Sequence, residues 1–426
     1  MKIKYIITIL LFSGIGIQLP AQIKYTLEDC KNIAIENNKK IKNSLLEIKS
    51  AQESKKDVFT SYFPNISAMA FGFKAKDPMM TMDMGGTPVG LLDDGLTGAI
   101  TLNQPIFVGG KIVYGNKLAK LGIEVKEQKA RLSENEVLYN VENQYWELVS
   151  LYEKMNTVTI IDEQLATLHK DVETSYEAGL ITLNDVLQVK LKQNELKSNR
   201  ANLENGILLL KMSLCQEMGF DLETSDNFDI AISDIQEPNP PMTFYMSHRE
   251  ALSNRAESKL LDKNIEATKL QTKMKRADYL PTVSVGATYF QNNFMDKWDG
   301  NGAVFISVSV PISGWWGGSH AIRKQKIDEQ IAYNNKMDGQ EQLLLQMQNV
   351  RNEFDNAYKQ LLIAKESIEQ STENLRLNND YYRVGMVKLT DVLDAQALLQ
   401  QSRDKYVDSH STYQKKRFEY LQVTGR

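Results

Sequence analysis

The stretch Asp380–Asp394, DYYRVGMVKLTDVLD, decides the fold because it ends one long helical pattern and starts another. Upstream of it, apolar or small residues recur at alternating spacings of four and three, the pattern of a coiled-coil seam. Gly385 interrupts the pattern, and a glycine can adopt the left-handed conformation that ends a helix. Thr390 and Asp391 then supply side-chain oxygens that can cap a new helix. The stretch is therefore predicted to be the tip of a helical hairpin. The seam residues are Leu343, Met347, Val350, Phe354, Ala357, Leu361, Ala364, Ile368, Ser371, Leu375, Asn378 and Tyr382.

A second tip lies earlier in the chain, in SYEAGLITLNDVL at 175–187. Gly179, Leu183 and Asp185 match their counterparts in the first stretch at a constant offset of 206 residues. Other landmarks recur at a similar distance, so the chain is predicted to be a tandem repeat. The predicted parts are a first structural repeat at 22–219 with its tip at 179–185, a linker at 220–245, and a second repeat at 246–426 with its tip at 385–391.

The N-terminus has the features of a removed signal peptide. Lys2 and Lys4 precede an apolar run that is too short to span a bilayer comfortably, and Pro20-Ala21-Gln22 offers a small residue for cleavage. Residues 1–21 are therefore predicted to be cleaved, which changes the formal net charge from -4 to -6. This mildly acidic balance gives no electrostatic reason to expect a nucleic-acid partner.

Each repeat also contains two segments in which large apolar residues alternate with small ones. They follow a Tyr-x-Pro sequence and predict one β-hairpin per repeat, at about 64–105 and 281–311. Each run has roughly ten residues, the length of a tilted transmembrane strand, although a soluble sandwich with one buried face has the same alternation. The small residues, predicted to face a lumen, are Ala68, Ala70, Gly72, Thr97, Ala99, Ser284, Gly286, Ser307 and Ser309. The large apolar residues include Met69, Phe71, Phe73, Leu96, Ile100, Leu102, Val304, Ile306, Val308 and Val310.

Four strands of the membrane type cannot close a barrel, and an open sheet edge cannot face lipid. The barrel must then be shared between chains. Two chains would give eight strands, whose interior is filled by side chains, whereas three chains would give twelve strands and leave space. Because small residues suit an open interior, a channel is predicted.

At this point the chain resembles the TolC-type outer-membrane efflux proteins over essentially all of the mature sequence. The resemblance is carried by the two tips, by the Tyr-x-Pro entries, and by the strand exits QPIFVGGK at 104–111 and VPISGWWGGS at 310–319. It implies a mainly α fold with β strands, in which long antiparallel coiled-coil hairpins form an α-barrel across subunits. Four strands per chain would contribute to a 12-stranded transmembrane β-barrel. It further implies a homotrimer in the outer membrane that extends into the periplasm and meets a periplasmic adaptor protein and an inner-membrane transporter.

The same resemblance assigns roles to residues at the tips. It places the channel constriction at Asp391 and Asp394, although Asp391 also suits helix capping. The counterpart of Asp394 in the first repeat is Gln188, so the hairpin itself does not require this second carboxylate. The resemblance also implies a gate network of Asp185, Tyr382 and Lys388, in which the family's arginine position is Val387. The tip residues for partner docking would be Gly179, Leu180, Leu183, Gly385, Met386 and Leu389.

The remaining candidate sites have ordinary structural explanations. Thioethers can bind copper(I), but a loop with four methionines also suits an adaptable, partly packed segment at a barrel end. Cys30 and Cys215 either pair or stay separate buried thiols. No nucleophile-base pair, phosphate loop or zinc motif occurs, so neither an enzyme nor a cofactor is predicted. The weak metal candidates are Met79, Met80, Met82 and Met84.

The sequence thus predicts a passive outer-membrane exit channel of a tripartite efflux pump that exports small toxic compounds. One alternative is the exit duct of a type I protein secretion system. Another is a secreted coiled-coil structural protein or adhesin, which would have no use for lipid-facing residues such as Val304 and Ile306.

Overall fold

The computed structural model describes residues 24–86, 88–90, 94–232, 237–294 and 297–426, so the predicted signal peptide lies outside the described residues. The chain forms two compact units. Unit 1 comprises Met1–Asn38, Asn140–Pro238 and Gln360–Lys415, and unit 2 comprises Lys39–Tyr139, Asn239–Lys359 and Lys416–Arg426. Each unit combines segments from both predicted repeats, because equivalent parts of the two repeats pack together.

Three long helices contribute to both units. They are α3 (Lys111–Glu177), α7 (Gly314–Arg383) and α8 (Leu389–Val423). The predicted seam of α7 is confirmed, since most of its members are buried. Its buried members are Met347, Val350, Phe354, Ala357, Leu361, Ala364, Ser371 and Leu375. Among the helices of the described residues, none has the length and hydropathy of a transmembrane span.

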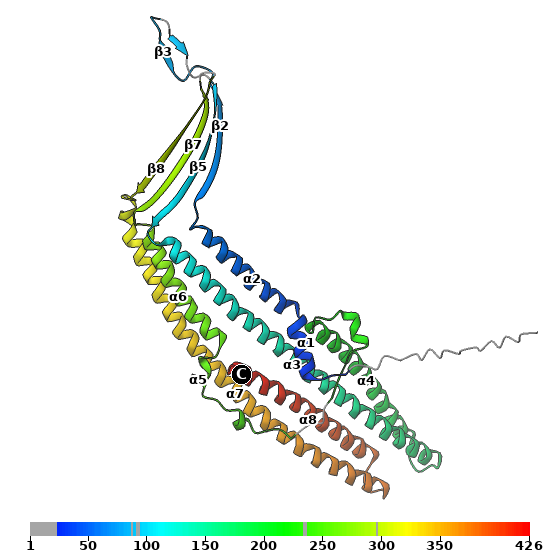
Figure 1. The fold of residues 1–426 in the computed structure, drawn as a ribbon. Coiled ribbons are helices and arrows are strands. Elements are labelled where there is room, and N and C mark those ends of the chain that lie inside the picture. Colours follow the sequence, from blue (N-terminus) through cyan, green and yellow to red (C-terminus); the bar gives the residue numbers. More distant parts are fainter. Residues whose placement is uncertain (1–23, 87, 91–93, 233–236, 295–296) are drawn as a thin grey trace, which may run out of the picture. The chain divides into compact units, whose positions relative to one another are not determined.

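Unit 1 contains two helical hairpins, formed by α3 with α4 (Leu183–Glu217) and by α7 with α8 (Figure 1). Val158, Ile161 and Leu165 on α3 pack with residues of α4 and α8 in one hydrophobic core. Short elements complete the unit: β1 (Lys24–Tyr25), α1 (Leu27–Asn37), a 3-10 helix η1 (Leu222–Asp226) and β6 (Asp229–Ile230), which pairs parallel with β1.

A buried charge fixes α1 against α3 in unit 1. The Glu142 carboxylate is almost fully buried, forms an ion pair with Lys31, and accepts a hydrogen bond of 2.8 Å from Trp146 Nε1. A buried carboxylate requires such partners, because removing one of them leaves charge without compensation. The region around Glu142 should therefore be sensitive to conservative changes.

We expect Trp146→Phe to lower the free energy of unfolding by about 1.5–3 kcal/mol, the usual contribution of a hydrogen bond to a charged group. Phenylalanine keeps an aromatic ring but removes the indole N–H and the second ring, so the loss combines the hydrogen bond with some packing against Tyr145 and His410. Thermal loss of helical circular dichroism from the purified protein in detergent measures it. Trp316→Phe is the control, because Trp316 is exposed and its indole forms no hydrogen bond within the described chain. Equal transition temperatures for the two variants would contradict the prediction.

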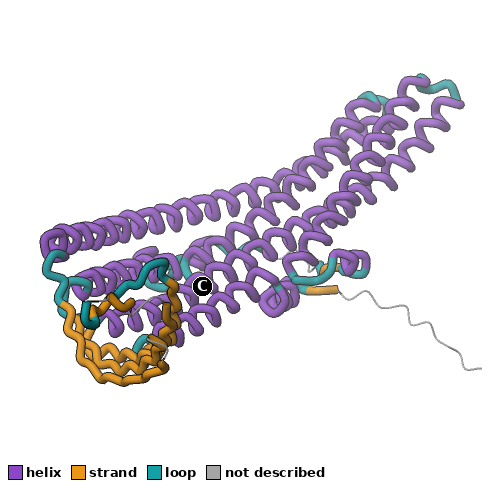
Figure 2. Tube along the Cα trace, turned by 90° about the horizontal axis from the view of Figure 1, so that it is seen from above, coloured by secondary structure: helices purple, strands orange, loops and turns teal. Residues whose placement is uncertain are grey.

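Unit 2 contains one antiparallel sheet of four strands in the order β2-β5-β7-β8. The strands are β2 (Asn65–Lys74), β5 (Asp94–Val108), β7 (Thr282–Phe294) and β8 (Lys297–Ser309), and Figure 2 shows that the sheet is curved. A small hairpin of β3 (Thr81–Asp83) and β4 (Pro88–Gly90) follows β2. The unit also contains α2 (Lys39–Thr60), η2 (Pro241–Phe244), α5 (His248–Leu252) and α6 (Ala256–Ala277).

The register corrects the predicted faces of β2. Directly paired residues of neighbouring strands lie on the same face of a sheet. Ala68 pairs with Ile100 and Gly72 pairs with Leu96, so the small residues of β2 share a face with the large residues of β5. The prediction that they share a face with Thr97 and Ala99 is wrong. Alternation within one strand separates two faces, but only pairing between strands establishes which faces coincide.

The other three strands agree with the predicted alternation. Ile100 pairs with Tyr289, and Val285 pairs with Ile306, which places large apolar side chains on one face of β5, β7 and β8. Thr101 pairs with Thr288 on the other face, where their hydroxyls form a hydrogen bond of 3.0 Å. The predicted fold class, mainly helical with four strands contributed to a sheet, is confirmed.

Candidate channel tip and constriction

The two helical hairpins of unit 1 turn at glycines with positive φ. Gly179 has φ of 72° and Gly385 has φ of 75°, which confirms the predicted left-handed turns. In each tip the N–H of the following residue donates back to the last turn of the helix: Leu180 N to Ser175 O, and Met386 N to Tyr381 O, both at 2.9 Å. These bonds satisfy carbonyls that a helix end would otherwise leave open.

A carboxylate three residues into the helix holds the start of each returning helix. Asp185 accepts hydrogen bonds from Thr182 N at 3.0 Å and from Thr182 Oγ1 at 2.7 Å. Asp391 accepts one from Lys388 N at 2.8 Å. Both carboxylates therefore satisfy N–H groups at a helix start, where negative charge is also favoured by the helix dipole. Asp391 thus caps the start of α8 as Asp185 caps the start of α4.

Asp394 lies in a different environment. It is exposed on α8, and its carboxylate forms no hydrogen bond or ion pair with another residue that the structure describes. It lines a hollow of about 390 Å³ between α4 and α8, together with Lys192 and Gln188, its counterpart in the first repeat. The carboxylate is therefore accessible to solvent, and no bond within the described chain requires it.

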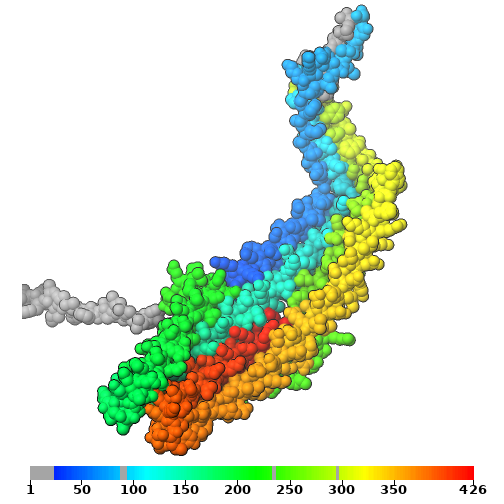
Figure 3. Space-filling view, turned by 180° about the vertical axis from the view of Figure 1, so that it is seen from behind, coloured from blue at the N-terminus to red at the C-terminus, as the bar shows by residue number. Residues whose placement is uncertain are grey.

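The ends of the two hairpins lie side by side in unit 1 (Figure 3). Leu389 and Leu393 of α8 pack with Val186 of α4 in one core. Leu389 is only 3% exposed, whereas its counterpart Leu183 is 51% exposed. Leu389 is therefore corrected from a docking residue to a core residue, because the contact between hairpins covers it.

The other predicted docking residues are accessible in the chain. Leu180 and Met386 are the most exposed large hydrophobic side chains of the two tips, and both follow the turn glycines directly. Their exposure leaves an apolar surface at each tip.

The predicted gate network is only partly brought together. Tyr382 is half-buried beside a hollow of about 830 Å³ that also contacts Asp171 and Val387. Burial of the phenol, followed by the negative charges of Asp185 and Asp171, raises the pKa of Tyr382. The Lys388 ammonium is exposed and forms no hydrogen bond or ion pair with Tyr382 or Asp185 in the described chain.

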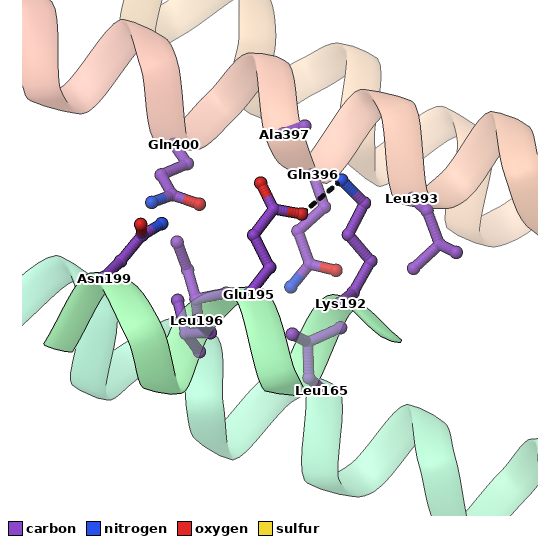
Figure 4. Close-up of a pocket in the computed structure, with 10 residues that line it drawn as sticks. Leu165, Lys192, Glu195, Leu196, Asn199, Leu393, Gln396, Ala397 and Gln400 are labelled. Atoms are coloured by element: carbon purple, nitrogen blue, oxygen red, sulfur yellow. Dashed lines mark hydrogen bonds and ion pairs between the residues drawn. The ribbon is translucent and has the colours of Figure 1, made fainter. Parts of the chain in front are cut away.

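A narrower pocket lies farther along the same helices, and the sequence did not single out its residues. The Lys192 ammonium pairs with the Glu195 carboxylate at 2.9 Å. Figure 4 shows this pair beside Leu393. Gln396 donates to Gln164 Oε1 at 3.3 Å and so links α8 to α3. The i, i+3 spacing of Lys192 and Glu195 was the available signal, but such pairs occur on many exposed helices.

The remaining candidates stay outside this site. Cys30 and Cys215 are free buried thiols, and burial raises their pKa values to about 12 and about 11. No group of three or more His, Cys, Asp or Glu residues in the described ranges is arranged to hold a metal ion. The methionines of the loop at 79–84 are exposed.

Comparison with known proteins identifies the architecture. The family model "Outer membrane efflux protein" matches residues 248–426, nearly the whole second predicted repeat. No curated protein matches the sequence. The structure is similar to that of the outer membrane protein VceC from Vibrio cholerae, with 18% identity, a TM-score of 0.76, and coverage of 94% of this chain and 96% of VceC.

It is also similar to the CmeC outer membrane channel of Campylobacter jejuni, with 15% identity, a TM-score of 0.80, and coverage of 94% and 85%. The open state of the MtrE outer membrane channel of Neisseria gonorrhoeae gives 13% identity, a TM-score of 0.70, and coverage of 94% and 88%. Residues 248–426 therefore match the outer membrane efflux protein family model, and the chain as a whole has the fold of these solved outer-membrane proteins.

Proposed function

We propose that this protein is the outer-membrane exit channel of a tripartite efflux pump and a passive duct for small toxic compounds. The observation that carries the proposal is the combination of a four-stranded sheet with one continuous apolar face and two long helical hairpins that end in exposed tips. A single chain closes neither a β-barrel nor a helical tunnel. The match to the outer membrane efflux protein family model supports a role of both parts in export.

The apolar face is suited to lipid. Val304 is 85% exposed, and Ile306 and Val308 beside it on β8 are also exposed. So many exposed branched residues on one face would be a liability in water, whereas an outward apolar band is what a transmembrane strand requires. Because β2 and β8 are the open edges of the sheet, chains must pair edge to edge in a membrane. Three chains supply twelve strands.

The helical hairpins serve as the periplasmic part of the duct in this proposal. Exposed Leu180 and Met386 at their tips would contact a periplasmic adaptor protein and an inner-membrane transporter. Asp391 and Asp394 would line the narrowest part, and the Asp394 carboxylate would be free to attract ions there, because neither a cap nor an ion pair occupies it in the described chain. The channel would then admit cargo from the pump at the tips and release it beyond the outer membrane.

The partner test is affinity purification of the tagged protein from cross-linked cells. Recovery of an adaptor with a proton- or ATP-driven drug transporter supports the efflux function. Recovery of a protein-secretion transporter would assign the same duct to secretion and overturn the cargo class. A purified chain that forms no ion-conducting pores in planar bilayers would overturn the channel itself.

Native mass spectrometry of the protein in detergent should give three copies per particle. Four strands per chain leave two edges whose N–H and C=O groups have no partners in hydrocarbon, so a lone chain is not a stable membrane species. A well-behaved membrane-embedded monomer, or a dimer, would contradict the shared twelve-stranded arrangement.

A further inference from the structure

The register of β2 places its largest side chains on an unexpected face. Met69 pairs with Ala99, and Phe71 pairs with Thr97. These partners belong to the face on which Thr101 and Thr288 exchange a hydroxyl hydrogen bond. A thioether and two aromatic rings therefore share a face with small and hydroxylated residues, opposite to the face that carries Val304 and Ile306.

These side chains protrude from the face. Met69 is 66% exposed and Phe71 is 57% exposed, and the rings of Phe71 and Phe73 lie 6.2 Å apart at an angle of 21°. Their partners on β5 are small: Ala99, Thr97 and Gly95. Large side chains opposite small ones project above their neighbours, so they form a raised apolar patch.

The side of the sheet that meets water follows from the contrast between its faces. Ile100 pairs with Tyr289 on one face, and the exposed apolar residues continue there across β5, β7 and β8. The other face carries mostly hydroxyls and small residues on the same three strands, together with the rings of Phe290 and Phe305. Lipid requires the first face, so the second face lines the lumen, and the patch on β2 points into it. This step rests on the proposed channel function.

We propose that Met69, Phe71 and Phe73 from three copies form an apolar collar in the strand-lined lumen, a transient contact site for aromatic cargo. Phe73 lies near the end of β2 that leads to β3, so the collar sits toward the loop end of the strands and away from the Pro64 end. Aromatic faces attract flat apolar molecules and organic cations. The same ring of apolar side chains raises the barrier to hydrated ions.

Cysteine accessibility tests the orientation. The native Cys30 and Cys215 are fully buried, so they contribute little background labelling. We expect a charged, membrane-impermeant methanethiosulfonate reagent to modify Phe71→Cys and Thr97→Cys in proteoliposomes but not Ile100→Cys. Protection of Phe71→Cys to the level of Ile100→Cys would overturn the inference.

Single-channel recording tests the collar itself, with ethidium as an aromatic cation and tetramethylammonium as an aliphatic one. The double variant Phe71→Ser, Phe73→Ser should conduct more potassium than the wild type, and ethidium should need about tenfold higher concentration for half block. Block by tetramethylammonium and all properties of Thr97→Ser, on the same face, should stay unchanged. If the wild type forms pores and ethidium blocks the double variant at the same concentration as the wild type, the collar is overturned but the channel function stands. If the wild type forms no pores, the channel function itself is overturned.

Discussion

A chain with valine at both Gly179 and Gly385 should assemble as a channel in the outer membrane yet fail to restore drug resistance to a strain that lacks the wild-type protein. Both residues have φ above 70°, a region that β-branched residues almost never occupy. The left-handed conformation costs a residue with a Cβ roughly 1–2 kcal/mol, and branching adds to this. The strain acts at the tips, far in sequence from the four strands of the sheet that the proposal places in the membrane.

The surroundings of the two glycines make this prediction specific. A Cβ at either position would meet nothing within 4 Å, so the substitution acts through backbone conformation and not through collision. Asparagine tolerates the left-handed region, and the double variant Gly179→Asn, Gly385→Asn is therefore the matched control and should keep resistance. Minimal inhibitory concentrations measure function, and trimer on native gels measures assembly. Full resistance with valine at both tips would show that tip geometry does not govern coupling to the pump.

Much of the helical architecture could be predicted, because the spacing of apolar residues and the residues that end or begin a helix are local features of the sequence. The 4,3 spacing along α7 identified buried Met347 and Phe354, and the two tips were found from the glycines together with the capping residues that follow them. Repetition strengthened each inference, since one tip supported the other. These features depend on residues that are neighbours in sequence.

The predictions were wrong where the position of a side chain depends on contacts between segments that are distant in sequence. The face of Ala68 was misassigned because its partner Ile100 lies 32 residues away, and size alternation does not reveal register. Leu389 matches Leu183 in sequence, but only α8 buries its leucine between the hairpins. Internal repeats therefore predict equivalent backbones and not equivalent exposure.

Asp391 shows a third limit of prediction from sequence, because one residue can have both a structural and a functional role. Its carboxylate caps Lys388 N, as Asp185 caps Thr182 N, so a local structural role exists whether or not the residue also acts on ions. An alanine at this position would remove charge and cap together. Asparagine keeps an acceptor oxygen and removes only the charge, so it separates the two roles.

We therefore expect the double variant Asp391→Asn, Asp394→Asn to resist block by a trivalent cation. In the proposed trimer, three chains bring six of these carboxylates around one axis. A constriction with low-dielectric walls screens them poorly, so they attract multivalent cations strongly. With the cation added on the tip side of a planar bilayer, half block of the variant should require at least about tenfold higher concentration than half block of the wild type, and its cation preference should fall.

Asp185→Asn is the matched control for this measurement, because it removes the equivalent capping charge from the first repeat. The single variants Asp391→Asn and Asp394→Asn then show how much of the relief from block each carboxylate contributes. Asp394 has no bonded partner in the described chain, so its charge is fully available, and Asp394→Asn should account for most of the relief from block. If Asp185→Asn relieves block as much as Asp394→Asn, the cation responds to the general charge of the tips. If the double variant is blocked as readily as the wild type, the constriction lies elsewhere, and Asp391 is only a helix cap.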